Sequence, residues 1–241
     1  MTTAGDAVPA GPAATVPVVR DLGRVAWERI EPMMRAFNAA RTPATADEIW
    51  LLEHPPVYTL GRAASMAHVH RPGDIPVLRA ERGGEVTYHG PGQAVCYPLV
   101  DLRRRHFGAR AFVECIEAAT LAFLIGRGVD AVLRPGAPGV YVRAHDADGS
   151  SHPGAKIASI GIRISAGFSW HGVALNVDMD LEPFTRIDPC GYPGLAVTDL
   201  RTVLGANGGT LTGTVTGQPR AAAVPMAFAR HLAQAIAARG A

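Results

Sequence analysis

Three features are missing from this sequence of 241 residues, and each absence excludes a class of protein. No run of 18 uncharged apolar residues occurs, which argues against a transmembrane helix. The net charge of +2 is too small for the basic surface of a nucleic-acid-binding protein. The cysteines are an odd number, Cys96, Cys115 and Cys190, so a disulfide framework is not expected. The apolar content of 48% predicts a globular protein with a substantial core.

Lysine is almost absent, because only one of the 23 lysine and arginine residues is a lysine, Lys156. A guanidinium does not release its proton in a protein, whereas an ammonium can do so. Lys156 lies between Gly154 and Gly161 in a run of small and apolar residues that predicts a buried strand. A buried lysine is costly unless it is used, so we interpret Lys156 as a candidate for proton transfer. The alternative is that one lysine escaped a bias towards arginine.

The pattern of apolar residues predicts an α+β fold in which helices flank a mixed sheet. Residues 1–17 are rich in alanine, proline, threonine and glycine, which predicts a flexible tail before a single domain over residues 18–241. They lack the basic and apolar regions of a secretory signal, and a cytoplasmic protein is expected. Helices are predicted at residues 22–40, 111–125 and 223–238, the last after a loop that begins near residue 206. Strands are predicted at residues 48–52, 57–60, 131–133, 140–142, 156–164 and 168–176.

Several turns and caps are also predicted. A Gly90-Pro91-Gly92 turn between apolar segments at 85–88 and 94–100 suggests a β-hairpin. Thr198 is expected to cap a short helix that ends near Gly205. The polar segment 145–152 holds two histidines and two aspartates, but their spacing matches no known metal-ligand set, so a solvated hairpin tip is predicted and no metal site.

A basic cluster, Arg103-Arg104-Arg105, is the densest of the chain. We expect it to attract an acidic partner, although a solvated basic turn is the simpler interpretation.

Cys190 differs from the other two cysteines in its surroundings. Cys96 and Cys115 lie in apolar segments that are typical of a core, whereas Cys190 stands between Pro189 and Gly191 in a segment of turn-forming residues. A cysteine on a constrained loop is placed to react, and a nearby ammonium would increase its thiolate fraction. Cys190 and Lys156 are therefore a candidate nucleophile and base, although the sequence alone does not show that they meet.

A further unusual segment, besides those around Lys156 and Cys190, contains two adjacent glycines and several polar side chains. Gly83 and Gly84 allow a backbone to approach a ligand closely, and Arg82, Thr87 and His89 supply polar groups beside them. A glycine-rich bend with no ligand would give the same pattern.

Taken together, these segments resemble the lipoyl(octanoyl) transferase family. The resemblance covers about residues 20–205 and rests on ordered runs, which are Glu53–Gly61, Arg82–Gln93, Gly154–Gly161, His171–Asn176 and Pro189–Gly191. It implies the fold of the biotin and lipoate protein ligase catalytic domains. It also implies an acyltransferase that needs no cofactor, with Cys190 and Lys156 as catalytic residues.

The resemblance further implies the substrates. An octanoyl group would pass from acyl carrier protein, through a thioester on Cys190, to a lysine of a lipoyl domain. Such acceptors are the lipoyl domains of 2-oxoacid dehydrogenase E2 subunits and the glycine cleavage H protein. The residues that the resemblance assigns to substrate binding are Arg82, Gly83, Gly84, Glu85, Val86, Thr87, Tyr88, His89, Ser159, Ile160, Gly161, Gly172, Val173 and Ala174.

Two other functions fit part of the pattern. An ATP-dependent lipoate or biotin ligase would share the fold and use a lysine, but it would not need Cys190. A lipoyl-domain-binding protein without catalysis would form no acyl adduct.

Overall fold

The computed structural model describes residues 15–145, 151–206, 211, 214–215 and 218–239. In this part of the chain a mixed seven-stranded sheet has the order β1-β2-β6-β10-β9-β8-β7. Only β1 and β2 pair in parallel; the other neighbours are antiparallel. The strands are β1 (Val18–Arg24), β2 (Glu48–Glu53), β6 (Gln93–Leu99), β7 (Ala131–Leu133), β8 (Gly139–His145), β9 (Ser151–Ser165) and β10 (Phe168–Asn176). The predicted α+β fold with a mixed sheet is confirmed.

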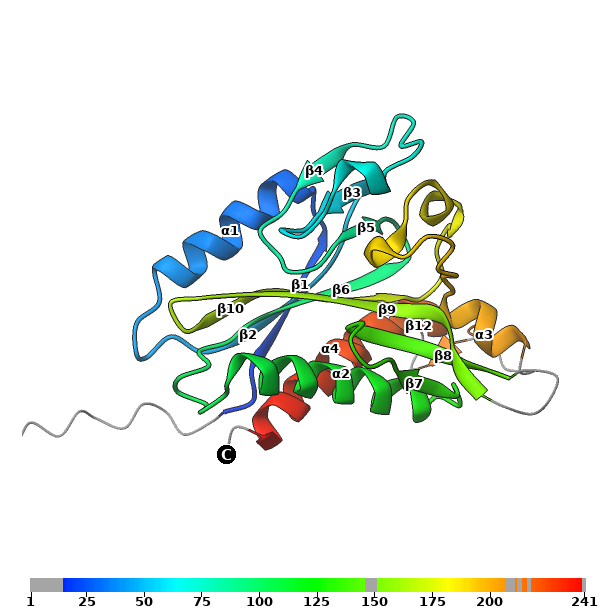
Figure 1. Cartoon of the computed structure of the whole chain (residues 1–241). Helices are drawn as coiled ribbons and strands as arrows, with labels where there is room; N and C mark the ends of the chain where they lie inside the picture. Colours follow the sequence, from blue (N-terminus) through cyan, green and yellow to red (C-terminus); the bar gives the residue numbers. More distant parts are fainter. Residues whose placement is uncertain (1–14, 146–150, 207–210, 212–213, 216–217, 240–241) are drawn as a thin grey trace, which may run out of the picture.

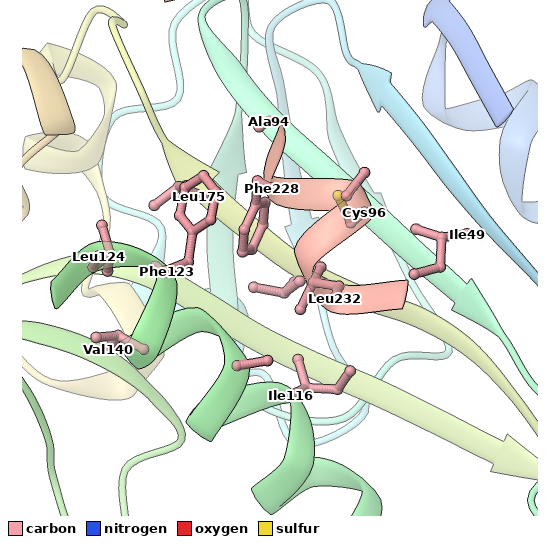
Figure 2. Packing of buried hydrophobic residues seen from close by; sticks show 14 of the residues in the cluster. Ile49, Ala94, Cys96, Ile116, Phe123, Leu124, Val140, Leu175, Phe228 and Leu232 are labelled. Atoms are coloured by element: carbon pink, nitrogen blue, oxygen red, sulfur yellow. The ribbon is translucent and has the colours of Figure 1, made fainter. Parts of the chain in front are cut away.

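One face of this sheet is covered by α2 (Ala109–Ile125) and α4 (Arg220–Arg239) (Figure 1). Their apolar stripes meet the strands in the largest core of the described residues. Phe123 of α2 and Phe228 of α4 lie with ring centroids 4.9 Å apart, and Cys96 and Leu175 reach this core from the sheet (Figure 2). This side of the sheet is therefore filled by side chains and offers a rigid support.

The opposite face carries α1 (Trp27–Ala39) and a smaller sheet of order β4-β3-β5 (Figure 1). Its strands are β3 (Val57–Leu60), β4 (Val77–Arg79) and β5 (Val86–His89). The 3-10 turns are η1 (Met66–His68), η2 (Glu182–Arg186) and η3 (Pro189–Gly191). The remaining elements are α3 (Leu200–Ala206), β11 (Thr214–Val215) and β12 (Gln218–Pro219). Since α1 and the small sheet cover this face only in part, a pocket remains between them and the main sheet.

The first predicted helix begins too early. Residues 22–24 belong to β1, in which Asp21 pairs with Leu51 and Arg24 with Glu53, and α1 begins only at Trp27. The apolar spacing of residues 22–37 fits a helix, but parallel pairing with β2 satisfies the backbone of the first residues. A pairing partner distant in the sequence decided this boundary.

The predicted hairpin around Gly90-Pro91-Gly92 is wrong. The two segments are strands, but β5 pairs with β3 in the small sheet, whereas β6 pairs with β2 and β10 in the main sheet. Gly92 has φ +83°, and a Cβ there would lie 1.8 Å from the Asp178 carbonyl oxygen. The turn therefore passes the chain from one sheet to the other against a crowded backbone, which requires glycine.

Two further predictions need correction or lie outside the described residues. The cap of α3 is Asp199, not Thr198, because its carboxylate accepts a hydrogen bond of 2.8 Å from the Thr202 amide. Residues 146–150, the centre of the predicted polar turn, lie outside the described residues, as do most residues of the loop after Ala206.

The cluster Arg103-Arg104-Arg105 is not a solvated basic patch. Arg105 is 3% exposed, and Arg104 and Arg105 both bind the buried carboxylate of Asp47, at 2.7 and 2.5 Å. Only Arg103 of the three is largely exposed. Two of these arginines therefore hold the fold together, which leaves Arg103 as the one largely exposed cation of the cluster for the predicted docking site.

Within the described residues, no helix is both long and apolar enough to cross a membrane.

Candidate active site

Lys156 and Cys190 meet in the structure. The Lys156 Nζ lies 2.9 Å from the Cys190 Sγ and 2.8 Å from the Pro138 carbonyl oxygen, while its side chain is almost fully buried. The same ammonium lies 5.1 Å from the ring centroid of Tyr141, so its charge also faces an aromatic ring. The three donors of an ammonium are thereby directed towards a sulfur, a carbonyl and a ring face.

The backbone of Lys156 is held on both sides. Its amide donates to the Ala196 carbonyl at 2.8 Å, and its carbonyl accepts from the Thr198 amide at 3.0 Å. Because Ala196 and Thr198 follow the Cys190 loop, these bonds tie the loop to β9. The reacting groups thus sit on two segments that are joined by main-chain hydrogen bonds.

Gly139 makes room for the lysine side chain. It has φ +131°, and a Cβ at this position would lie 2.5 Å from the Lys156 Cε. Its amide donates to the Glu117 side chain at 3.1 Å, which anchors the start of β8 to α2. Glycine is therefore required here by both backbone conformation and space.

Cys190 stands on a strained turn. Its φ and ψ are 59° and 21°, a left-handed conformation that residues other than glycine seldom adopt. The turn is anchored by the Asp188 amide, which donates to the His68 carbonyl at 2.9 Å, and by the Gly191 amide, which donates to Asp188 at 2.9 Å. Strain of this kind persists where the surroundings hold it, and here it directs the thiol to the ammonium.

The Cys190 and Lys156 side chains line a pocket with a volume of about 360 Å³. Its walls come from the Arg82–Thr87 segment, His89, the middle of β9 and the Gly172–Ala174 stretch of β10. The pocket thus holds every residue that the resemblance assigned to substrate binding except Tyr88. The Tyr88 ring packs instead against Tyr58 and Phe184, with centroids 5.5 and 5.4 Å away.

Arg82 is a buried cation beside this pocket. Its guanidinium donates to the Thr59 carbonyl oxygen at 2.6 Å, to the Thr59 hydroxyl and to the Gly83 carbonyl oxygen at 3.0 Å. Burial lowers the pKa of Arg82 to about 10, so it remains a cation at neutral pH. Its hydrogen bonds fix the bend at Gly83 and Gly84, which packs against Gly61 and Gly161 with little space for a Cβ.

Several pocket residues were not singled out from the sequence. Trp27, Tyr97 and His171 line its inner part, while Tyr192 and the 136–138 segment lie on the side of the catalytic pair. They come from α1, β6, β10 and loops that are distant in the sequence, and no local pattern marks them. His171 was part of a recognised run, but its position in the pocket depends on the packing of β10.

The other cysteines are in different surroundings. Cys96 and Cys115 are buried in the largest core, and burial raises the pKa of each thiol. Neither has a cation in hydrogen-bond contact among the described residues. Cys190 alone combines partial exposure with a neighbouring ammonium.

The described residues contain no cluster of three or more histidine, cysteine, aspartate or glutamate side chains that could bind a metal ion.

Comparison with known proteins shows the family of this chain. Residues 25–212 match the family described as the lipoyl protein ligase A/B catalytic domain. The chain belongs to this family. An octanoyltransferase of Thiobacillus denitrificans is 55% identical over 79% of this chain and 82% of its own length. An octanoyltransferase of Cupriavidus necator is 48% identical over the whole chain and 94% of its own length.

Solved structures show the same fold at low sequence identity. A bipartite lipoate protein ligase from Thermoplasma acidophilum aligns with a TM-score of 0.56 at 12% identity, over 88% of this chain and 82% of its own. A lipoate-protein ligase A bound with ATP also aligns with a TM-score of 0.56, at 13% identity, over 88% of this chain and 94% of its own. The predicted likeness to the ligase catalytic domains is confirmed for the fold.

Proposed function

We propose that this protein is an octanoyltransferase of protein lipoylation, in which Cys190 carries the acyl group and Lys156 moves the proton. The contact of 2.9 Å between the Lys156 Nζ and the Cys190 Sγ carries this proposal. The activity is supported by two octanoyltransferases whose sequences are 55% and 48% identical to this chain. We further propose that octanoyl-acyl carrier protein is the donor. The acceptor is a lysine of a lipoyl domain, as in 2-oxoacid dehydrogenase E2 subunits and the glycine cleavage H protein.

The first half-reaction transfers the acyl group to the enzyme. The Cys190 thiolate, paired with the Lys156 ammonium, attacks the carbonyl carbon of the donor thioester and forms a new C–S bond. The bond to the carrier sulfur breaks, and the departing thiolate takes a proton from Lys156. The products are an acyl-Cys190 thioester, a neutral Lys156 amine and a free carrier thiol. One thioester replaces another, so no ATP is needed.

The second half-reaction regenerates the pair. The neutral amine of the acceptor lysine attacks the acyl carbonyl, an amide forms, and the bond to Cys190 breaks. The proton that the acceptor nitrogen loses goes to the Lys156 amine, which restores the ammonium beside the Cys190 thiolate. An arginine at this position would stabilise the thiolate but would not exchange protons.

Backbone amides near the thiol are the candidates for stabilising the oxyanion of each tetrahedral intermediate. The amides of Gly83 and Gly191 are already used, because they donate to Ile162 and Asp188. The amides of Gly84 and Cys190 have no acceptor among the described residues, so we assign the oxyanion to them. The acyl tail would occupy the pocket along Ser159 and Gly161.

Intact-mass spectrometry after incubation with octanoyl-acyl carrier protein tests the proposal. We expect one octanoyl adduct on Cys190 in the wild type and none in Cys190→Ser, while Cys96→Ser and Cys115→Ser retain the adduct. Addition of a lipoyl domain should then remove the adduct and add the same mass to the domain. An octanoyl adduct that maps to Cys96 or Cys115 would contradict the assignment.

The same assay separates the rival functions. An ATP-dependent ligase would modify the lipoyl domain from free octanoate and ATP, and it would do so in the Cys190→Ser variant. A non-catalytic binding protein would give no adduct with any donor.

A further inference from the structure

The inner part of the pocket contains two buried histidines, and three of their four ring nitrogens have no hydrogen-bond partner among the described residues. His171 is fully buried, and neither of its nitrogens has a hydrogen-bond partner within the described residues. The Nε2 of His89, which is 5% exposed, has none there either. Both residues line the same pocket as Cys190. Buried polar atoms are nearly always hydrogen-bonded, so three unpaired nitrogens at one end of a ligand pocket call for an explanation.

The orientation of His171 is held against a backbone preference. Its φ is 56°, a left-handed conformation in the middle of strand β10. The imidazole is stacked on Trp27 and Trp170, with ring centroids 5.7 and 4.7 Å away. The conformation places Trp170 and His171 on the same side of the sheet, although alternation along a strand would separate them. A strained, stacked and unpaired imidazole in a pocket is typical of a binding role.

The hydrogen-bond network defines what His89 presents to the pocket. The side-chain nitrogen of Gln93 donates to the Tyr88 carbonyl oxygen and to Asn176, so the Gln93 oxygen faces His89 Nδ1, at 2.7 Å. Nδ1 therefore carries the proton. Burial lowers the pKa of His89 well below 6.5, and the neutral ring leaves Nε2 as an acceptor.

His54 shows what a structural histidine looks like in the same cluster. Its Nδ1 lies 2.6 Å from the Val25 carbonyl oxygen and its Nε2 lies 2.8 Å from the Tyr97 hydroxyl, so both nitrogens are paired. The protein thus has the means to satisfy a buried imidazole here, but it does not do so for His171.

The histidines lie away from the catalytic pair along the pocket. His171 pairs with Ile162, six residues beyond Lys156 on β9, so the imidazole and the catalytic pair border different parts of the pocket. The buried Arg82 packs against Gly161, which pairs with Gly172, the residue that follows His171. An acyl chain bound to Cys190 would point its terminal methyl group towards the imidazoles.

We propose that His89 and His171 form a polar end wall of the acyl pocket that limits the length of the acyl chain. This inference rests on the proposed acyl transfer to Cys190 and adds a specificity-determining role for these two residues. A chain that ends short of the wall leaves the nitrogens free to bind water or another polar group. A longer alkyl chain buries them against a methyl group, and an unsatisfied buried nitrogen then costs about tenfold or more in binding.

A polar end wall predicts a preference among acyl chains that an apolar pocket would not show. A nonanoyl chain and an 8-hydroxyoctanoyl chain have nearly the same length and differ only in a terminal methyl or hydroxyl group. The hydroxyl group can donate to His89 Nε2, whereas the methyl group cannot. In an apolar pocket the hydroxyl group would be the disfavoured one, because its desolvation would be uncompensated.

The test compares rates of Cys190 acylation by octanoyl, nonanoyl, decanoyl and 8-hydroxyoctanoyl thioesters of pantetheine, followed by intact mass. We expect the wild type to react at least as fast with the 8-hydroxyoctanoyl as with the nonanoyl thioester, and slowly with the decanoyl one. In His171→Phe, which keeps the ring but removes both nitrogens, the nonanoyl and decanoyl rates should rise about tenfold relative to the hydroxylated chain. His171→Asn, which tolerates a positive φ, should retain part of the hydroxyl preference.

His231→Phe is the matched control, because His231 also packs on an aromatic ring, Phe123, but lies outside the pocket. It should leave the ratio of the nonanoyl and 8-hydroxyoctanoyl rates unchanged. A wild-type enzyme that strongly prefers the nonanoyl chain overturns the polar wall even if His171→Phe fails to fold. Absence of acylation by the octanoyl thioester would instead contradict the proposed function.

Discussion

Two buried polar regions of this protein differ in how their central polar groups are paired. Around Asp47, the carboxylate binds Arg41, Arg104 and Arg105 and accepts a further hydrogen bond of 2.9 Å from the Asp101 amide. In the pocket, the Lys156 ammonium binds a reactive thiol, and both nitrogens of His171 lack partners among the described residues.

The comparison separates a structural role from a functional one. The Asp47 cluster joins the turn after β6 to the segment before β2, and its carboxylate has a protein donor on both oxygens. The pocket stores backbone strain at Cys190 and His171 and leaves polar atoms free, which lowers stability unless a ligand uses them. Arginine serves the first region because it forms several fixed hydrogen bonds, and lysine serves the second because it can release a proton.

The largest expected effect concerns Lys156. We predict that Lys156→Arg lowers the rate of octanoyl transfer by 10²- to 10⁴-fold, nearly as much as Lys156→Ala, because proton transfer contributes roughly this factor. Single-turnover transfer to a lipoyl domain measures it. Alkylation of Cys190 by iodoacetamide should stay faster in the arginine than in the alanine variant, since the fixed charge still favours a thiolate. Substantial turnover by Lys156→Arg would leave Lys156 with an electrostatic role only.

For the structural region we predict a loss of stability without a loss of chemistry. Asp47→Asn leaves the nearly inaccessible guanidinium groups of Arg41 and Arg105 without a counter-charge, and it should lower the free energy of unfolding by about 3–5 kcal/mol. Urea unfolding measures this change. Asp130→Asn, which breaks a pair with Arg143 on an exposed carboxylate, is the control and should cost less than about 1 kcal/mol. If the Asp47→Asn protein folds but Cys190 is no longer acylated by the donor, the Asp47 region is not purely structural and this prediction is contradicted.

The buried histidines in and beside the pocket should make stability depend on pH. Burial lowers the pKa of His54 to about 4 and that of His171 to about 3, so in the folded protein both stay neutral while the unfolded chain takes up protons below about 6.5. Their contribution is therefore complete above pH 6.5 and falls as the pH drops towards 4. Each should give a slope of about 1.4 kcal/mol per pH unit in the middle of this window.

Urea unfolding at pH 7, 6 and 5 measures that slope, and the window lies above the range in which carboxylates such as Glu48 protonate. In His171→Phe the slope should decrease by the contribution of one histidine, which is about 1.4 kcal/mol per pH unit in the middle of the window. An equal slope in both proteins would show that His171 is protonated, or accessible, in the folded state.

The smallest effect is expected from Gly139. In Gly139→Ala the new methyl group would lie 2.5 Å from both the Lys156 Cε and the Ala158 carbonyl oxygen, so the backbone must shift and the ammonium must move away from Cys190. We expect acylation of the folded protein to slow by about tenfold, as for a displaced catalytic group. Gly128→Ala is the matched control, because Gly128 also has a positive φ but no neighbour within 4 Å. Similar rates in both variants would show that backbone strain, not crowding of the lysine, is responsible.

Several features could be predicted from local residue patterns. The strands at 57–60 and 168–176 and the α2 helix follow from runs of apolar residues with the matching period, and the fold class follows from their order. The composition marked Lys156, and the loop residues beside Cys190 marked the third cysteine. The runs of motif residues then indicated the family.

The remainder required partners that are distant in the sequence. Residues 22–24 form part of a strand because they lie along the edge of β2, with which β1 pairs. The segments before and after Gly90–Gly92 belong to two different sheets because β5 pairs with β3 and β6 pairs with β2. Arg104 and Arg105 have the sequence pattern of a solvated basic turn, but both bind Asp47, which is more than 50 residues away in the chain. Tyr88 follows the same strand pattern as its neighbours, but its ring packs against Tyr58 and Phe184 instead of lining the pocket.

The sequence by itself determined which chemical groups this protein carries: one lysine, a cysteine among turn-forming residues, and paired glycines that permit close backbone contact. These are properties of residue type and local conformation, which do not depend on the rest of the chain. Only the tertiary structure decided that the Lys156 Nζ and Cys190 Sγ lie 2.9 Å apart and that His171 faces a pocket with no protein partner among the described residues. Both features arise from packing and strand pairing between segments that are far apart in the chain. The free energy of such contacts cannot be inferred from local residue patterns.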